Sequence, residues 1–264
     1  MRETFRMSVL LEYPLNPDFG DGVFYRRIQL TNQGNACVGQ LEDCCHGFEV
    51  TIHHDGESIT DVEPTARRVP FNTCPGAGKL LGASLIGQSI HSNLRDIYTW
   101  CKPRSQCTHW LDLALLAVKQ AARRNEHQRD YVVSIPDETD KPVQAAVYCN
   151  QEQILAWHVH NWSIHQPEAL QGNTLHKGFS QWMFEYFDGD VDKQEAAFVL
   201  QKGYFVSCAK RYDINCLAGK RAVDDAHMAG SCYTYGEANI DSAVRQANSF
   251  RDFTDNTAAL LRFE

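Results

Sequence analysis

The sequence predicts an α+β protein in which antiparallel strand meanders alternate with helical segments. Segments with period-two alternation fall into two groups, and each group is followed by segments with helical periodicity. The resulting order is strands, helices, strands, helices. A doubly wound parallel sheet would need strands and helices to alternate one by one, and that pattern is absent from the sequence.

The first strand group is expected at residues 23–30, 37–45, 46–54 and 58–67. Asp55-Gly56 is typical of a tight hairpin turn between the last two of these strands. In the third strand, alternation places His46 on the same face as Phe48 and Val50. The ring of His46 should therefore point toward the core or toward a pocket.

The first helices are expected after residue 73. Cys74-Pro75 should open one helix, because proline is favoured at the first helical position. Residues 107–124 have the clearest helical pattern, with an apolar stripe that includes Trp110 and Leu111. Further strands are expected at residues 130–135, 143–149 and 153–164, and further helices at residues 176–187 and 192–208.

The chain is expected to form one main domain. Residues 1–22 are interpreted as an N-terminal arm, residues 23–212 as a single α+β domain, and residues 213–264 as a C-terminal extension that packs on the domain. A content of 43% hydrophobic and 22% charged residues suits such a packed domain. Whether the two strand groups share one sheet is open at this point, as is a homodimer.

Charge and hydropathy restrict the partners and the compartment. A formal net charge of −8 without a long basic run argues against a nucleic-acid partner. No apolar stretch is long enough for a membrane span, and charged residues interrupt the first eleven residues, so neither a membrane partner nor a secretory signal is expected. The ten cysteines have irregular spacing without a C-x-x-C pair. A cytoplasmic protein with free thiols is the expectation.

Several common cofactor and catalytic motifs are absent, including the phosphate-binding loop, the dinucleotide-binding glycine motif, the zinc-protease motif and the serine nucleophile elbow. We therefore expect no cofactor. The chemistry would then depend on side chains alone or on a metal held by scattered ligands.

The segment from Cys107 to Asp112 has the highest density of reactive side chains. At a helix start, the helix dipole favours the thiolate of Cys107. His109 and Asp112 are three residues apart, so they share a helix face and could act as an acid/base pair. In the alternative interpretation, Asp112 satisfies first-turn N–H groups and His109 is merely exposed.

Two further candidates lie in the first half of the chain. Asp43 and His46 stand where two strands meet, as an orienting carboxylate and an acid/base, or alternatively as a satisfied buried histidine with its partner. Arg68 precedes the helix at Cys74 and would add to an anion-binding site, unless it forms a surface salt bridge.

A third candidate is the strand that carries His158, His160 and Trp162 on alternate positions. These side chains would bind substrate on one strand face. The two histidines could instead bind a metal, although no spaced third ligand accompanies them. Because sites gather at element ends, we predict that at least three residues of one set line a single cavity: His46, Arg68, Cys107, His109 and Asp112.

Short motifs spread over most of the chain carry a family resemblance. In order they are Asp43 to His46, Arg68-x-Pro70, Cys74-Pro75-x-Ala77, Gly87 and Cys107-Thr108-His109-x-x-Asp112. Together, over about residues 25–212, they resemble a bacterial family defined by a domain of unknown function, number 2889. The order of elements also faintly resembles iron–sulfur scaffold proteins of the SufE/NifU type, but their three cluster cysteines cannot be matched here. The resemblance to the family of unknown function also implies an association with bacterial breakdown of plant phenolics, including lignin-type dimers.

The leading functional hypothesis is a cofactor-independent lyase that acts on a phenolic or other aromatic small molecule. An acid/base group removes a phenolic proton, a benzylic C–O bond opens, and a hydroxymethyl carbon leaves as formaldehyde. The expected acid/base and orienting residues are His46, His109, Asp112 and Asp43, and the expected substrate-binding residues are Arg68, Cys107, Cys74, His158, His160 and Trp162. Two alternatives stay open: a non-catalytic thiol/histidine module that binds or delivers metal, and a cysteine-dependent transferase.

Overall fold

The structure is a computed structural model that describes residues 13–97, 99–101, 105–225 and 228–263. Residues 1–12 of the expected N-terminal arm therefore lie outside the described residues, as does residue 264 at the chain end. The described residues form an eight-stranded antiparallel sheet with helices, which confirms the predicted α+β class.

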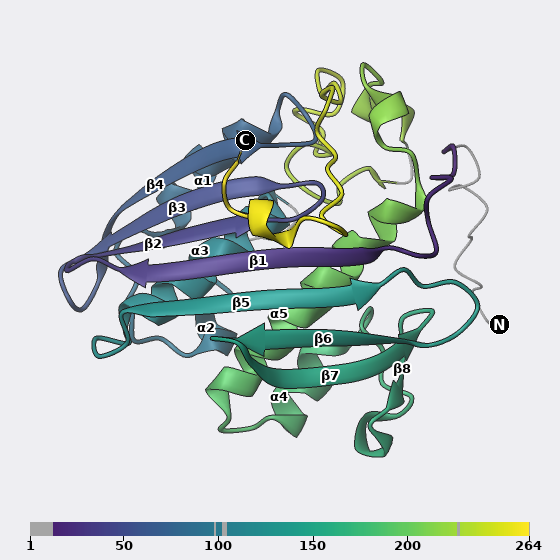
Figure 1. Ribbon diagram of the computed structural model, residues 1–264. Helices are drawn as coiled ribbons and strands as arrows, with labels where there is room; N and C mark the ends of the chain where they lie inside the picture. Colours follow the sequence, from purple (N-terminus) through teal and green to yellow (C-terminus); the bar gives the residue numbers. More distant parts are fainter. Residues whose placement is uncertain (1–12, 98, 102–104, 226–227, 264) are drawn as a thin grey trace.

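The first half of the sheet is a meander of four strands joined by short turns. They are β1 (Val23–Asn32), β2 (Ala36–Glu42), β3 (Gly47–His54) and β4 (Ile59–Arg68). The second half continues with β5 (Gln128–Pro136), β6 (Val143–Cys149), β7 (Glu152–His160) and β8 (Ser163–Gln166). The strand order β4-β3-β2-β1-β5-β6-β7-β8 shows that both groups belong to one sheet, joined where β1 pairs with β5 (Figure 1).

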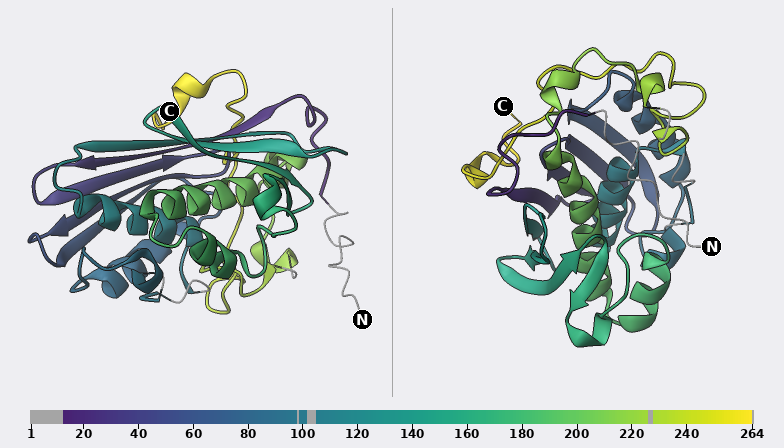
Figure 2. Two further views of the ribbon diagram at one scale, coloured as in Figure 1. Left: turned by 90° about the horizontal axis from the view of Figure 1, so that it is seen from below. Right: turned by 90° about the vertical axis from the view of Figure 1, so that its right-hand side faces the viewer.

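The helices lie on one face of this sheet, as the left view of Figure 2 shows. They are α1 (Ala77–Leu85), α2 (Leu94–Ile97), α3 (Thr108–Ala121), α4 (Phe179–Tyr186) and α5 (Val191–Ser207). α3 packs on β1, β2 and β3, whereas α5 packs on β5, β6 and β7. The short 3₁₀ turns are Cys74–Gly76, Glu168–Leu170, Cys208–Arg211, Asn215–Leu217, Ala222–Asp224 and Thr257–Ala259.

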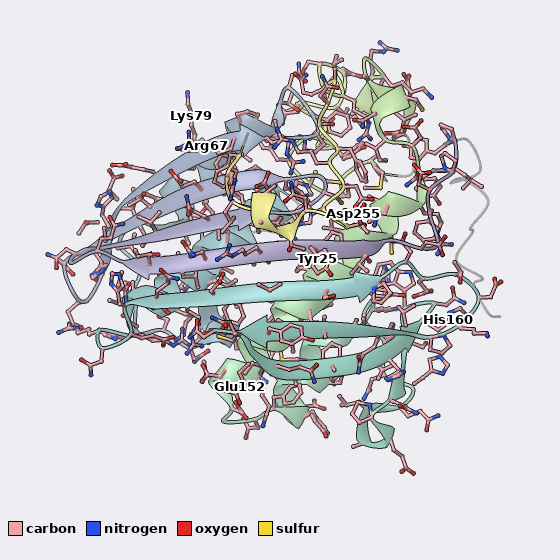
Figure 3. All side chains as sticks on the ribbon, in the orientation of Figure 1. Tyr25, Arg67, Lys79, Glu152, His160 and Asp255 are labelled. Carbon is pink, nitrogen blue, oxygen red and sulfur yellow. The ribbon has the colours of Figure 1, made fainter. Side chains whose placement is uncertain are left out.

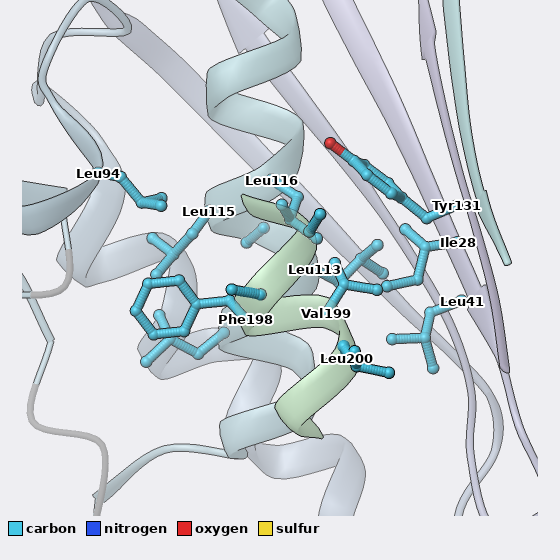
Figure 4. Close-up of a cluster of buried hydrophobic side chains, with 14 of the residues drawn as sticks. Ile28, Leu41, Leu94, Leu113, Leu115, Leu116, Tyr131, Phe198, Val199 and Leu200 are labelled. Carbon is cyan, nitrogen blue, oxygen red and sulfur yellow. The ribbon is translucent and has the colours of Figure 1, made fainter. Parts of the chain in front are cut away.

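The main core fills the space between the sheet and the helices α3 and α5 (Figure 4). Every second side chain along the strands points into this layer, and the apolar stripes of the helices pack against those side chains. The contributing side chains include Ile28, Leu41 and Tyr131 from the sheet, Leu113, Leu115 and Leu116 from α3, and Phe198, Val199 and Leu200 from α5.

A glycine lets α5 lie close to the sheet. A Cβ atom at Gly203 would stand 2.7 Å from Cγ1 of Val133 in β5, nearer than real Cβ atoms approach a neighbour. The close contact therefore depends on the absence of a side chain at position 203.

Residues 213–225 and 228–263 run mostly without long regular elements and pack on the domain. Part of this segment crosses to the sheet face opposite the helices, where it appears in yellow above the sheet in Figure 2. There the backbone N–H of Leu261 donates to the carboxylate of Glu42 at 2.7 Å. Glu42 is the last residue of β2 and is fully buried. The extension thus covers one end of the first half of the sheet.

Among the residues that the structure describes, no helix is both long enough and apolar enough to cross a lipid bilayer.

Candidate functional site

One end of the sheet brings together four segments that are distant in the sequence. Here residues 43–46 connect β2 to β3, α3 begins, α5 ends, and β7 turns into β8. His160, labelled in Figure 3, marks this end. Aromatic contacts link three of the segments: ring centroids are 6.5 Å apart between His109 and Phe205, and 5.9 Å apart between Phe205 and Trp162.

The turn from residue 43 to residue 46 is organised by the Asp43 carboxylate. Its Oδ1 accepts hydrogen bonds from the backbone N–H groups of Cys45 at 2.9 Å and His46 at 2.8 Å. These bonds replace strand pairing, so β2 ends at Glu42. The alternation pattern had predicted that this strand would continue to residue 45. The same oxygen lies 3.0 Å from Nδ1 of the His46 ring. A proton on Nδ1 donates to this carboxylate and leaves Nε2 for proton exchange.

Arg26 completes the carboxylate's surroundings from β1. Its Nη1 donates to Asp43 Oδ2 at 3.1 Å, and both side chains are buried. Burial alone would raise the pKa of Asp43, but the charge and hydrogen bond of His46 and the charge of Arg26 outweigh it and hold the pKa well below its usual range. Asp43 is therefore a permanent anion behind His46.

His109 lies against His46 at the start of α3. The two ring centroids are 4.1 Å apart and the rings are inclined by 37°. The pKa of His109 lies well below its ordinary value, because burial disfavours the cation and the charges of His46 and Arg26 add to that effect. His109 Nδ1 is inaccessible to solvent and has no hydrogen-bond partner among the described residues. His109 is therefore neutral near pH 7.

Arg26, Asp43, His46 and His109 thus form a linear chain of contacts with a fixed anion at its centre. The two histidines cannot comfortably carry charge together at this separation. The imidazole of His46 is hydrogen-bonded to a carboxylate, whereas the imidazole of His109 is held neutral. Different environments for two adjacent titratable groups are a common arrangement for moving a proton in two directions.

Arg68 supports the same turn, which corrects its expected role as an anion binder. Its two terminal nitrogens donate to the main-chain carbonyl oxygens of Asp43, Cys44 and His46, to the carbonyl oxygen of Ser249 and to the carboxylate of Glu42. Five acceptors thus surround two buried nitrogens, which leaves neither for a substrate. The guanidinium is buried because the carbonyl oxygens of the turn and of the extension need hydrogen-bond donors there.

Cys107 and Cys74 were expected to bind substrate, and the thiol of Cys107 was also expected to ionise at a helix start; the structure places neither cysteine in the lining of the pocket described below. Cys107 is the N-cap residue of α3, but its side chain caps no N–H group. Burial, followed by the proximity of Cys74, raises the pKa of the Cys107 thiol far above its usual value. Burial also raises the pKa of the Cys74 thiol, which lies 3.3 Å from the Thr234 hydroxyl. Desolvation outweighs the helix dipole here, so neither sulfur is an activated thiolate.

A pocket of about 410 Å³ opens between α3, α4 and α5. Its α3 wall contains Thr108 and Asp112, which flank His109 along the helix. Asp112 Oδ2 lies 3.5 Å from Nζ of Lys202 on α5. Asp112 thus borders the pocket, as expected of a site residue, and an oppositely charged residue faces it.

Lys202 was missed by the sequence interpretation. It stands four residues after Phe198 and three before Phe205, so all three lie on one side of α5. A lysine between aromatic residues at helical spacing is the signal that could have identified it. Phe205 is 46% exposed and contacts both His109 and Trp162.

The strand expected at residues 153–164 is two strands. Asn161 and Trp162 both have positive φ angles, 46° and 68°, and form the tight turn between β7 and β8. Trp162 consequently packs against Tyr204 and Phe205 of α5, whereas Nδ1 of His160 lies 3.5 Å from Glu138. The prediction that the three alternate residues share one face was therefore wrong for Trp162.

His158 stays on β7, paired in register with Gln166 of β8 and apart from the contacts of His46. The prediction that at least three of the five residues line one cavity is not met in this pocket. His46, His109 and the turn-supporting Arg68 belong to one network, but of the five residues named for one cavity, Asp112 is the one that lines the pocket. His46 and Arg68 instead contact the carboxylates of Asp43 and Glu42, at 3.0 Å and 3.2 Å.

Comparison with known proteins finds neither a matching protein-family model nor a similar curated protein. Within the described residues, no group of three or more His, Cys, Asp or Glu side chains is arranged to hold a metal ion. The geometry of the side chains therefore carries the functional argument.

Proposed function

We propose that this protein is a cofactor-independent lyase that uses acid/base chemistry on a phenolic small molecule. The observation that supports the proposal best is the contact chain Asp43–His46–His109, with 3.0 Å between carboxylate and imidazole and 4.1 Å between ring centroids. Such a chain can accept a proton on one imidazole while the neighbouring imidazole stays neutral.

In the proposed reaction, His46 and His109 act at the aliphatic oxygens of the substrate. The phenol gives its proton to solvent, and electron density from the phenolate breaks the para-benzylic C–O bond, giving a quinone methide and an alkoxide. One imidazole protonates that leaving oxygen. A base then removes the proton of a hydroxymethyl O–H, the C–C bond breaks to release formaldehyde, and its electron pair restores the aromatic ring. Protonation of the phenolate closes the balance, so no oxidant or reductant is consumed.

Asp43 supports both proton transfers without changing its own charge. A carboxylate behind His46 stabilises the imidazolium that forms, and fixes the ring so that Nε2 is the exchanging atom. The neutral His109 can donate a hydrogen bond to an oxygen that gains negative charge. The choice of a phenolic substrate class follows from the resemblance to proteins associated with breakdown of plant phenolics.

The first prediction concerns these two histidines. We expect His46→Ala and His109→Ala each to lower the turnover number by roughly 10²–10⁴-fold, the usual loss for a general acid or base. Turnover is measured as formaldehyde release from a phenolic dimer that carries a benzylic ether and a hydroxymethyl group. His53→Ala is the matched control, since His53 lies on β3 and pairs with Glu63 at the surface.

The proposal fails if the wild-type protein releases no formaldehyde from such dimers. It also fails if both His46→Ala and His109→Ala turn over at the rate of His53→Ala while all three remain folded, as judged by thermal unfolding.

A further inference from the structure

We propose that the pocket between α3, α4 and α5 binds a phenolic ring, with the ring hydroxyl held between Lys202 Nζ and Asp112 Oδ2. This inference rests on the proposed function and deepens it, because it names the part of the substrate that the pocket recognises and the two residues that select it.

The apolar part of the pocket lining suits an aromatic ring. Leu111, Phe179, Phe184 and Phe198 line it, and all four are largely buried. Phe198 makes edge-on contacts with Phe179 and with Phe184, each with 5.6 Å between ring centroids. Interlocked rings of this kind hold their rotamers, and another ring can join them edge-on or offset. The volume of about 410 Å³ lies in the range of small-molecule sites.

The polar side of the pocket suits a hydroxyl group. The 3.5 Å between Lys202 Nζ and Asp112 Oδ2 exceeds the usual length of a direct ammonium–carboxylate hydrogen bond, about 2.7–2.9 Å. A hydroxyl both donates and accepts, so it can donate to Asp112 and accept from Lys202 at once. A carboxylate ligand would be repelled by Asp112, an amine would be repelled by Lys202, and an ether could not donate.

The same pair suits the chemistry expected of a phenol. Asp112 can accept the phenolic proton's hydrogen bond, and the ammonium group of Lys202 stabilises the phenolate oxygen as its charge develops. His109 lies on the same turn of α3 as Asp112, and the charge of Lys202 also contributes to its low pKa.

A purely structural role is the competing explanation, in which the Asp112–Lys202 contact only ties α3 to α5. The two explanations differ in what a substitution changes. A structural bridge affects the unfolding temperature alone, whereas a recognition pair affects which ligand the pocket prefers.

Binding of 4-ethylphenol and of its methyl ether, 4-ethylanisole, tests this by isothermal titration calorimetry on the full chain. We expect the wild-type protein to bind the phenol at roughly millimolar concentration or tighter, and at least about tenfold more tightly than the ether. Lys202→Met and Asp112→Asn should each reduce this preference to about threefold or less. Lys79→Met is the matched control, because Lys79 is exposed on α1 near the β4 edge of the sheet (Figure 3), and should keep the preference.

Equal binding of phenol and ether by the wild-type protein would overturn the inference. So would absence of phenol binding, or full retention of the preference in folded Lys202→Met and Asp112→Asn. The formaldehyde assay separates this result from the proposed function. A phenol preference without turnover would contradict the proposed lyase activity and support the pocket assignment. Turnover without the preference would support the lyase activity and contradict the pocket assignment.

Discussion

His109 links the site to the pH dependence of folding. Its pKa in the folded protein lies well below the ordinary value, chiefly because of burial and then because of His46 and Arg26. In the unfolded chain the imidazole titrates near its ordinary pKa of about 6.5. Between these two values the unfolded state binds more protons, so the folded state loses stability as the pH falls below about 6.5.

We therefore predict that His109→Gln flattens the rise in unfolding free energy between about pH 5 and pH 7.5, by at most about 1.4 kcal/mol per pH unit. Urea unfolding at several pH values measures this slope. His53→Gln, at a surface position, should retain the wild-type slope. An identical slope in His109→Gln would mean that His109 titrates normally in the folded protein.

At the scale of single residues, the sequence singled out the two histidines and Asp43 as candidates but not the groups that surround them. Arg26 was recognisable in principle, because it occupies a core-facing position of β1 between Phe24 and Ile28, where a charge needs a partner. Nothing in the local pattern showed that this partner is Asp43. The burial of Cys107, which reverses the effect of the helix dipole on its thiol, depends on distant segments and could not be read from residues 107–112.

At the scale of elements, α5 shows how one position controls helix packing. Gly203→Ala would place a methyl group 2.7 Å from Val133 Cγ1, so the helix or the strand must shift. We expect a loss of about 1–3 kcal/mol in the unfolding free energy, measured by urea denaturation. Gly82→Ala in α1 is the matched control, because its Cβ would meet Val62 at 3.8 Å, an ordinary contact. That control should be neutral or stabilising by up to about 1 kcal/mol.

If Gly203→Ala is as stable as Gly82→Ala, the spacing between α5 and β5 is not set by this glycine. A second substitution, Val133→Ala, should recover part of the loss in Gly203→Ala by removing the atom that the new methyl group meets.

Most strands and the long helices were predictable because their periodicity is local. The errors fall where a single residue overrides the pattern. Asp43 ends β2 early through side-chain hydrogen bonds, and Trp162 occupies a tight turn that usually selects asparagine and glycine. No alternation rule contains this information, because a strand pattern and a two-residue turn within it look alike when the turn carries a tryptophan.

At the scale of the whole molecule, Glu42 connects the extension to the site. Its carboxylate accepts from the Leu261 backbone, lies 3.2 Å from Arg68 and 3.6 Å from Arg251, and has no exposed surface. We predict that Glu42→Gln lowers the unfolding free energy by about 1–3 kcal/mol, because buried arginine then lacks its full counter-charge.

Chemical denaturation measures this effect, with Glu63→Gln at the surface as the control. A change smaller than about 0.5 kcal/mol in Glu42→Gln would place the Arg68 counter-charge elsewhere. The joining of the two strand groups at β1 and β5 belongs to the same scale, and the sequence could not predict it. These strands are about a hundred residues apart, and pairing between such distant segments leaves no local signature.

The strand order has the character of a palindrome. Outward from the β1–β5 pair, each side runs through three more strands in chain order, and each side carries its own long helix on the same face. The sheet thus has two wings, β1–β4 with α3 and β5–β8 with α5, which meet at a central seam formed by the antiparallel β1–β5 pair. The proposed phenol pocket takes Asp112 from the helix of one wing and Lys202 from the helix of the other. Recognition of the substrate would then require both wings to be packed together at the seam, because neither wing by itself contains both groups that bind the hydroxyl.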